Sequence, residues 1–193
     1  MKTTARLAAA ACAGALFLSG CDPEEMPKFV TGAEKIDQWR VDEKGWWHAQ
    51  LPAGTKSSHF FVNGQRRLRP CVPRKGWFYM DDLAVQTNAE KQVFRAREGQ
   101  IDASWGMEGV EACLVQAWMM IRAPVESYDA ETRVVTCGSA PKKGSWVRFD
   151  RRHWYRLENV KEAFGEPGDW YLDKSGELVY APLPGEDPAT AEA

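Results

Sequence analysis

The chain has 193 residues and a formal net charge of −2, with 44% hydrophobic and 27% charged residues. This composition is typical of a folded globular protein, and the length suits one domain with its own core. The slightly acidic balance argues against binding to nucleic acid, so no nucleic-acid partner is expected.

The first 20 residues have the construction of a bacterial export signal. Lys2 and Arg6 give a positive start, and an Ala-rich apolar run follows over 7–18, too short to span a bilayer permanently. The segment closes with Leu18-Ser19-Gly20-Cys21, which resembles the lipobox of bacterial lipoproteins. The resemblance implies that Cys21 is acylated and becomes the first mature residue. An ordinary secretory signal with an incidental cysteine is the alternative.

A lipid on Cys21 predicts a protein anchored to a bilayer of the bacterial cell envelope, facing the periplasm or the exterior. We expect a signal helix over 1–20 and a polar tether over 21–29. The globular domain is expected over 30–183, and the Pro-, acid- and Ala-rich residues 184–193 predict a disordered tail. The sequence does not distinguish the inner from the outer membrane.

Short strands separated by turns follow the tether. Residues 39–41 and 46–51 flank a charged turn that contains Gly45. Residues 59–62 and 65–68 flank Asn63-Gly64, a strong signal for a two-residue hairpin. Further strands are expected at 76–80, 92–97 and 101–105.

The central part of the chain predicts a long antiparallel pair. An apolar run over 111–128 is followed by a turn at 129–132 and a return strand at 133–137. Helix is the competing interpretation for 112–121 because Met, Leu, Gln and Ala favour it, but the run continues past Pro124 and favours a strand.

One short helix is expected near 158–164, ending at Gly165, before a last hairpin over 170–172 and 177–180. Together these elements predict an all-β fold, an antiparallel sandwich or an irregular barrel with that single short helix in addition to the signal helix.

Three cysteines remain after the signal and the lipidation site: Cys71, Cys113 and Cys137. An exported protein can form a disulfide, but any pairing leaves one thiol over, and buried free thiols are equally consistent. The sequence contains no CxxC and its three histidines are scattered singly, so neither a metal site nor a cofactor is predicted.

Several segments together resemble one family. They are residues 39–41, 45–47, 61–67, 127–133, 157–163 and 167–173. The family is the secreted right-handed parallel β-helix proteins related to polysaccharide-degrading glycoside hydrolases, where this block resembles a β-rich domain inserted early in the solenoid. The resemblance implies a carbohydrate-related setting. The solenoid coils, where the catalytic carboxylates of such enzymes are expected, are missing from this chain, and Pro70-Cys71-Val72-Pro73 departs from the family pattern.

Glycoside hydrolysis requires two carboxyl groups on either side of the scissile bond. The acidic residues considered for this role are Asp81, Asp82, Asp150, Glu158, Asp169 and Asp173. Ordinary turn and loop positions account for such acids, so no catalytic residue is assigned.

Aromatic side chains are the better binding candidates, because nine tryptophans follow the signal and indole rings stack on sugar rings. Trp47, Trp118 and Trp154 are candidates for carbohydrate stacking, with core packing as the alternative for each. Trp46 and Trp47 are neighbours on one strand, so one of the two is expected in the core. Arg151 and Arg152 are candidates for binding an anionic sugar, with a solvated strand edge as the alternative.

The sequence therefore favours a lipid-anchored envelope domain that is non-catalytic by itself and binds or positions a polysaccharide or a partner protein. A glycoside hydrolase, or a truncated fragment of one, is the first alternative. A purely structural envelope lipoprotein is the second.

Overall fold

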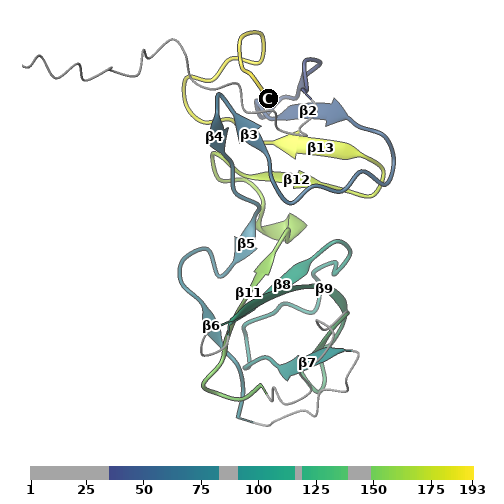
Figure 1. Ribbon diagram of the computed structural model, residues 1–193, viewed down its shortest axis with the longest axis vertical. Helices are drawn as coiled ribbons and strands as arrows, with labels where there is room; N and C mark the ends of the chain where they lie inside the picture. The colour runs from purple at the N-terminus through teal and green to yellow at the C-terminus, as the bar shows by residue number, and fades with distance from the viewer. Residues whose placement is uncertain (1–34, 83–90, 116–118, 139–148) are drawn as a thin grey trace, which may run out of the picture. The chain divides into compact units, whose positions relative to one another are not determined.

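The computed structural model describes residues 35–82, 91–115, 119–138 and 149–193. These residues form an all-β fold of antiparallel sheets (Figure 1), so the predicted fold class is confirmed. The signal segment, Cys21, the tether and Trp118 lie outside the described residues. Within the described part of the chain, no helix is long and apolar enough to cross a membrane.

The first sheet, here the small sheet, joins strands from both ends of the chain. Its order is β1 (Arg40–Val41), β2 (Trp47–Gln50), β13 (Glu177–Tyr180) and β12 (Trp170–Leu172). The register places Gln50 opposite Glu177 and Trp47 opposite Tyr180. A separate hairpin is made by β3 (Phe61–Val62) and β4 (Gln65–Arg66).

The second sheet, here the large sheet, contains seven strands among the described residues. Its order is β5 (Cys71–Val72), β11 (Trp154–Glu158), β8 (Glu111–Val115), β9 (Met120–Asp129), β10 (Val134–Cys137) and β7 (Gln92–Arg95). The remaining strand, β6 (Phe78–Tyr79), pairs with β11.

Alternation of apolar and polar residues directs one face of the large sheet into a core. In β9, Ile121, Ala123 and Val125 are buried while the residues between them are exposed. This period of two is what a strand with one buried face requires. The core that results contains mainly aliphatic and small side chains, together with Phe94, Phe149 and Tyr155.

Large rings fill the core of the small sheet. The Phe60 ring lies 5.2 Å from that of Tyr180 and 5.4 Å from that of Trp170, measured between centroids. Trp47 packs edge-on against Tyr180 at 5.4 Å. Tilted and edge-to-face contacts of this kind add to the free energy gained from burial alone.

The predicted hairpins at Asn63-Gly64 and at 170–180 are confirmed. Asn63 and Gly64 have φ values of 53° and 69°, which the mirror-image turns of two-residue hairpins require. In the second hairpin the Asp173 carboxylate accepts hydrogen bonds from the backbone N–H groups of Ser175 and Glu177.

The single long strand predicted over 111–128 is wrong in one respect. The described residues of this stretch are extended, not helical, but they divide into β8 and β9, which pair with each other in register Leu114↔Ile121. β8 and β9 both direct apolar side chains into the same core, so a hairpin of the two strands buries these side chains together. β9 then pairs with β10 as expected.

Two other predicted elements differ from the structure. The strand expected at 101–105 is a series of turns, because the Asp102 carboxylate accepts a hydrogen bond from the backbone N–H of Ser104. The helix expected near 158–164 is reduced to a 3-10 turn at Lys161–Ala163. Asn159 has a φ of 63° and Val160 is extended, so a helix cannot begin at Glu158.

The C-terminal residues and the cysteines complete the fold. Residues 184–193, expected to be disordered, carry hydrogen bonds: Asn63 N–H donates to Glu192 O, and Ile36 N–H donates to Ala193 O. Ala191 and Ala193 also pack against the core of the small sheet. The cysteine question left open by the sequence is answered by free thiols at 71, 113 and 137.

Candidate functional site

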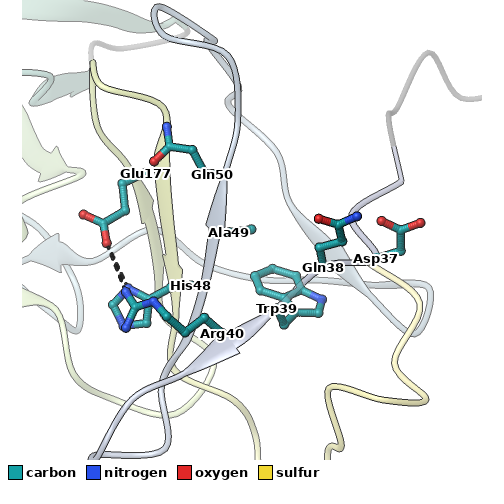
Figure 2. Close-up of a pocket in the computed structure, with 8 residues that line it drawn as sticks. All are labelled: Asp37, Gln38, Trp39, Arg40, His48, Ala49, Gln50 and Glu177. Atoms are coloured by element: carbon teal, nitrogen blue, oxygen red, sulfur yellow. Dashed lines mark hydrogen bonds and ion pairs between the residues drawn. The ribbon is translucent and has the colours of Figure 1, made fainter.

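A cleft of about 620 Å³ lies beside β1 and β2 of the small sheet (Figure 2). It is lined by Asp37, Gln38, Trp39, Arg40, His48, Ala49, Gln50 and Glu177. Figure 2 shows His48 and Glu177 at one end of the cleft and Gln38 and Asp37 at the other. A volume of this size is within the usual range for sites that take small molecules or single sugar residues.

Strand register brings these side chains together. In β2, Trp47 and Ala49 turn inward while His48 and Gln50 turn outward, as the alternation of a strand requires. Pairing with β1 places Arg40 beside His48, and pairing with β13 places Glu177 beside Gln50. Three strands therefore contribute polar side chains to one surface.

His48 is held between two carboxylates. Its Nδ1 lies 3.0 Å from Glu177 Oε1 and its Nε2 lies 3.2 Å from Asp42 Oδ2. Burial acts to raise the pKa of Asp42, but hydrogen bonds from the backbone N–H of Trp46 and from His48 outweigh it, so this pKa is lowered. The two carboxylates fix the orientation of the imidazole, and Arg40 lies 3.8 Å from Glu177.

Trp39 supplies the apolar part of the cleft. Its ring is half-buried and packs against Trp47 at 5.6 Å and against Phe60 at 6.2 Å between centroids. Its Nε1 is buried and has no hydrogen-bond partner among the described residues. The cleft thus combines an indole ring with planar amide, carboxylate, guanidinium and imidazole groups.

The candidate tryptophans predicted from the sequence occupy different environments. Trp47 is 2% exposed and belongs to the core of the small sheet, where no ligand reaches its ring. This corrects its assignment as a stacking residue. Trp154 is 39% exposed and contacts Tyr79 edge-on at 5.8 Å. It remains a candidate.

The candidate anion-binding arginines are at the surface, but both already have carboxylate partners. Arg151 Nη1 lies 3.2 Å from Asp82, and Arg152 Nη2 lies 2.5 Å from Asp150. The hydrogen bond from Arg152 lowers the pKa of Asp150 to about 2. Their exposure and pairing fit the alternative of a solvated strand edge.

The acidic residues considered for hydrolysis each have a structural partner. Asp81 pairs with Arg133, and Asp169 is a buried carboxylate that binds Arg74 through both oxygens. Burial acts to raise the pKa of Glu158, but the hydrogen bond from Arg156 and the charge of Arg122 outweigh it and lower this pKa. A general acid needs the opposite shift.

Asp173 behaves in the same way. Burial acts to raise its pKa, whereas hydrogen bonds from Ser175 and from the backbone of Glu177 lower it. Across the described residues, no group of three or more His, Cys, Asp or Glu side chains is placed to hold a metal ion.

Sequence reasoning missed the cleft because its polar residues are separate in the chain. One signal was present: Trp47 and Ala49 alternate with His48 and Gln50, which identifies Trp47 as the inward ring and His48 as outward-facing. Nothing in the sequence indicated that Glu177 pairs opposite Gln50.

Comparison with known proteins gives a likeness of fold. No family model matches the chain, and no curated protein matches it. A solved structure described as "Glycoside hydrolase" matches with a TM-score of 0.60 and 16% sequence identity, over 84% of this chain and 31% of that chain. The fold is related to part of a glycoside hydrolase. This chain spans about a third of the length of that enzyme.

Proposed function

We propose that this protein is a lipid-anchored domain of the bacterial cell envelope that binds a polysaccharide without hydrolysing it. Cys21 carries the lipid in this proposal, and the domain faces the periplasm or the exterior. The cleft on the small sheet is the proposed binding site. The observation that carries the proposal is the combination, in one cleft, of the Trp39 indole with planar hydrogen-bonding groups.

The chemistry of the cleft suits a sugar. A sugar ring has apolar C–H faces that pack on an indole, and hydroxyl groups at its edge that both donate and accept hydrogen bonds. Arg40 offers donors, Glu177 offers acceptors, and Gln38 offers both. The fold related to part of a glycoside hydrolase and the sequence resemblance to β-helix carbohydrate-active proteins support the same setting.

The carboxylates around His48 do not favour a hydrolase. Glu177 and Asp42 both contact His48, and the hydrogen bonds to Asp42 outweigh burial and lower its pKa. A general acid needs a raised pKa, from an apolar pocket or a nearby like charge, and Asp42 has the opposite shift.

Binding is tested with the full chain in detergent micelles, titrated calorimetrically with a panel of soluble plant and bacterial polysaccharides. Arg40→Ala and Gln38→Ala remove exposed cleft groups, and Trp39→Leu removes the aromatic ring but keeps an apolar side chain. We expect each to weaken binding by about tenfold, the effect of a lost interaction of about 1.4 kcal/mol.

Arg66→Ala is the matched control, because Arg66 is exposed on β4 and outside the cleft. Unchanged binding by all three cleft variants contradicts the proposed site. Absence of binding to every polysaccharide favours a structural lipoprotein, and release of reducing sugar contradicts the non-catalytic role.

The anchor is tested separately. Replacement of Cys21 by Ser leaves no thiol for acylation, so we expect the variant to move from the membrane fraction to the soluble fraction of the envelope. Retention of Cys21→Ser in the membrane fraction contradicts lipid anchoring through this residue.

A further inference from the structure

The outward face of the large sheet carries a row of apolar side chains that no other part of the described chain covers. Trp154 pairs in register with Tyr79 on one side and with Val115 on the other, and Val115 pairs with Met120. Paired residues in a sheet project from the same face. The next residues along these strands, Tyr155 among them, point into the core.

The row is accessible. Tyr79, Trp154 and Met120 are 47%, 39% and 59% exposed, and Val115 is half-buried. Four neighbours at a strand spacing of about 4.8 Å extend for about 14 Å across the sheet. This is a flat, elongated surface, unlike the cleft of the small sheet.

Arginines lie beside the row, two residues further along the same strands. Arg156 pairs with Cys113, which pairs with Arg122. The Arg156 guanidinium also lies 5.0 Å from the centroid of the Trp77 ring. The same face therefore presents aromatic rings and guanidinium groups together.

The charge of this face is positive toward solvent. Glu158 lies beneath the arginines: its side chain is 8% exposed, and it is 2.8 Å from Arg122, 2.5 Å from Arg156 and 3.7 Å from Arg69. The side chains of Arg122 and Arg156 remain about 30% exposed. The carboxylate holds the guanidinium groups in place while part of each stays available to a ligand.

The balance of charge points the same way. Arg69 also contacts Glu111, so three guanidinium groups meet two carboxylates. The excess positive charge is complementary to an anion.

We propose that this face binds a carboxylate-bearing polysaccharide strand, with sugar rings on Tyr79, Trp154 and Met120 and a uronate carboxylate on Arg122 and Arg156. The inference rests on the proposed function in that the ligand is a polysaccharide, and it adds a second surface and a chemical class. A protein partner or a second copy of this chain would remove both arginines from water, at a high desolvation cost. A hydrated polymer lying on the face leaves them partly solvated.

The test uses the full chain in detergent micelles and polygalacturonate as the probe, with its methyl-esterified form as the matched ligand that lacks the charges. We expect polygalacturonate to bind about tenfold more tightly than the ester and to weaken as salt is raised. Equal binding of the two polymers overturns the proposed role of the arginines.

Variants locate the site. We expect Trp154→Ala and Tyr79→Ala each to weaken polygalacturonate binding by about tenfold. We expect Arg122→Gln to reduce the difference in affinity between polygalacturonate and its methyl ester. Phe61→Ala removes an equally exposed ring from β3 and is expected to change nothing. Near-ultraviolet circular dichroism establishes that each variant is folded.

The outcomes separate this inference from the proposed function. If Arg40→Ala abolishes polygalacturonate binding and Trp154→Ala does not, the polymer occupies the cleft and the second surface is overturned. If sedimentation shows a dimer that Trp154→Ala dissociates, the face is an interface between copies and the inference is again overturned. If polygalacturonate fails to bind while a neutral glycan binds in the cleft, the second surface is overturned and the proposed function of the cleft is retained.

Discussion

The small sheet and the large sheet build their cores from different side chains. The small sheet packs Trp47, Phe60, Trp170 and Tyr180 around short strands from distant parts of the chain. The large sheet packs aliphatic and small residues that alternate along longer strands. A short strand supplies few core residues, so large rings among them fill the core. A longer strand supplies more core residues, and each of them can be smaller.

The small sheet also contains a buried polar network. Arg67 is 6% exposed, and its Nε donates to the Tyr180 hydroxyl at 2.7 Å. Its guanidinium also contacts Glu186, which accepts a hydrogen bond from Tyr180. Burial and the hydrogen bond to Glu186 raise the pKa of Tyr180, so the phenol stays protonated and donates. The C-terminal segment is attached to the small sheet through this network.

The largest effect is expected from Arg67→Ala. The change leaves the Glu186 carboxylate buried without its cation, which costs about 3 to 5 kcal/mol of unfolding free energy. Urea denaturation followed by tryptophan fluorescence measures it. Arg66→Ala, at the exposed neighbouring position, is expected to change stability by less than about 0.5 kcal/mol. Equal effects of the two variants would show that the small sheet does not depend on its polar network.

Leu114→Ala tests the large sheet. Leu114 is fully buried between Tyr155 and Ile121 in the strand register. Its truncation leaves a cavity that costs about 2 to 5 kcal/mol. Leu68→Ala is the control because Leu68 is 69% exposed. A loss below about 1 kcal/mol for Leu114→Ala would indicate that the core collapses around the gap and is loosely packed.

The smallest effect concerns the turn before β11. Because the hydrogen bond from Arg152 holds the pKa of Asp150 near 2, below its ordinary 3.8, the interaction stabilises the fold above about pH 4 and is lost as the pH falls toward 2. Arg152 is 80% exposed, so solvent screens this pair and we expect a small loss of stability.

Thermal unfolding of Asp150→Asn measures this contribution. The variant is expected to be slightly less stable than the parent at pH 6, and this difference is expected to shrink as the pH falls through 2, where the Asp150 carboxylate becomes protonated. Asp37→Asn, at an exposed position, serves as the control. A difference in stability that does not shrink between pH 4 and pH 2 would assign the stabilisation to hydrogen bonding in the turn rather than to charge.

The same contrast explains how far the sequence predicts the structure. Alternating residues indicate the inward face of β9, and Asn63-Gly64 indicates a hairpin, because both depend on local chemistry. The division into β8 and β9 was missed, since apolar residues continue through both strands. The short helix was missed because a positive φ at Asn159 prevents it from starting.

The candidate sites were predictable only in part. Trp154 was a candidate for carbohydrate stacking with core packing as the alternative, and the structure leaves it 39% exposed. The cleft depends on β13 pairing with β2, where Glu177 and Gln50 are far apart in the chain. Local patterns carry no information about such a register, so Glu177 and His48 could not be placed together from the sequence.

The pairing of β2 with β13 also sets an order of assembly. Synthesis releases the chain from its N-terminus, and β2 then has only the two-residue β1 as a partner until β13 has emerged. Every strand of the large sheet precedes β13 in the chain. The large sheet can therefore form while Trp47 of β2 still lacks its contact with Tyr180 of β13. During this interval Trp47 is the kind of exposed apolar residue that chaperones bind.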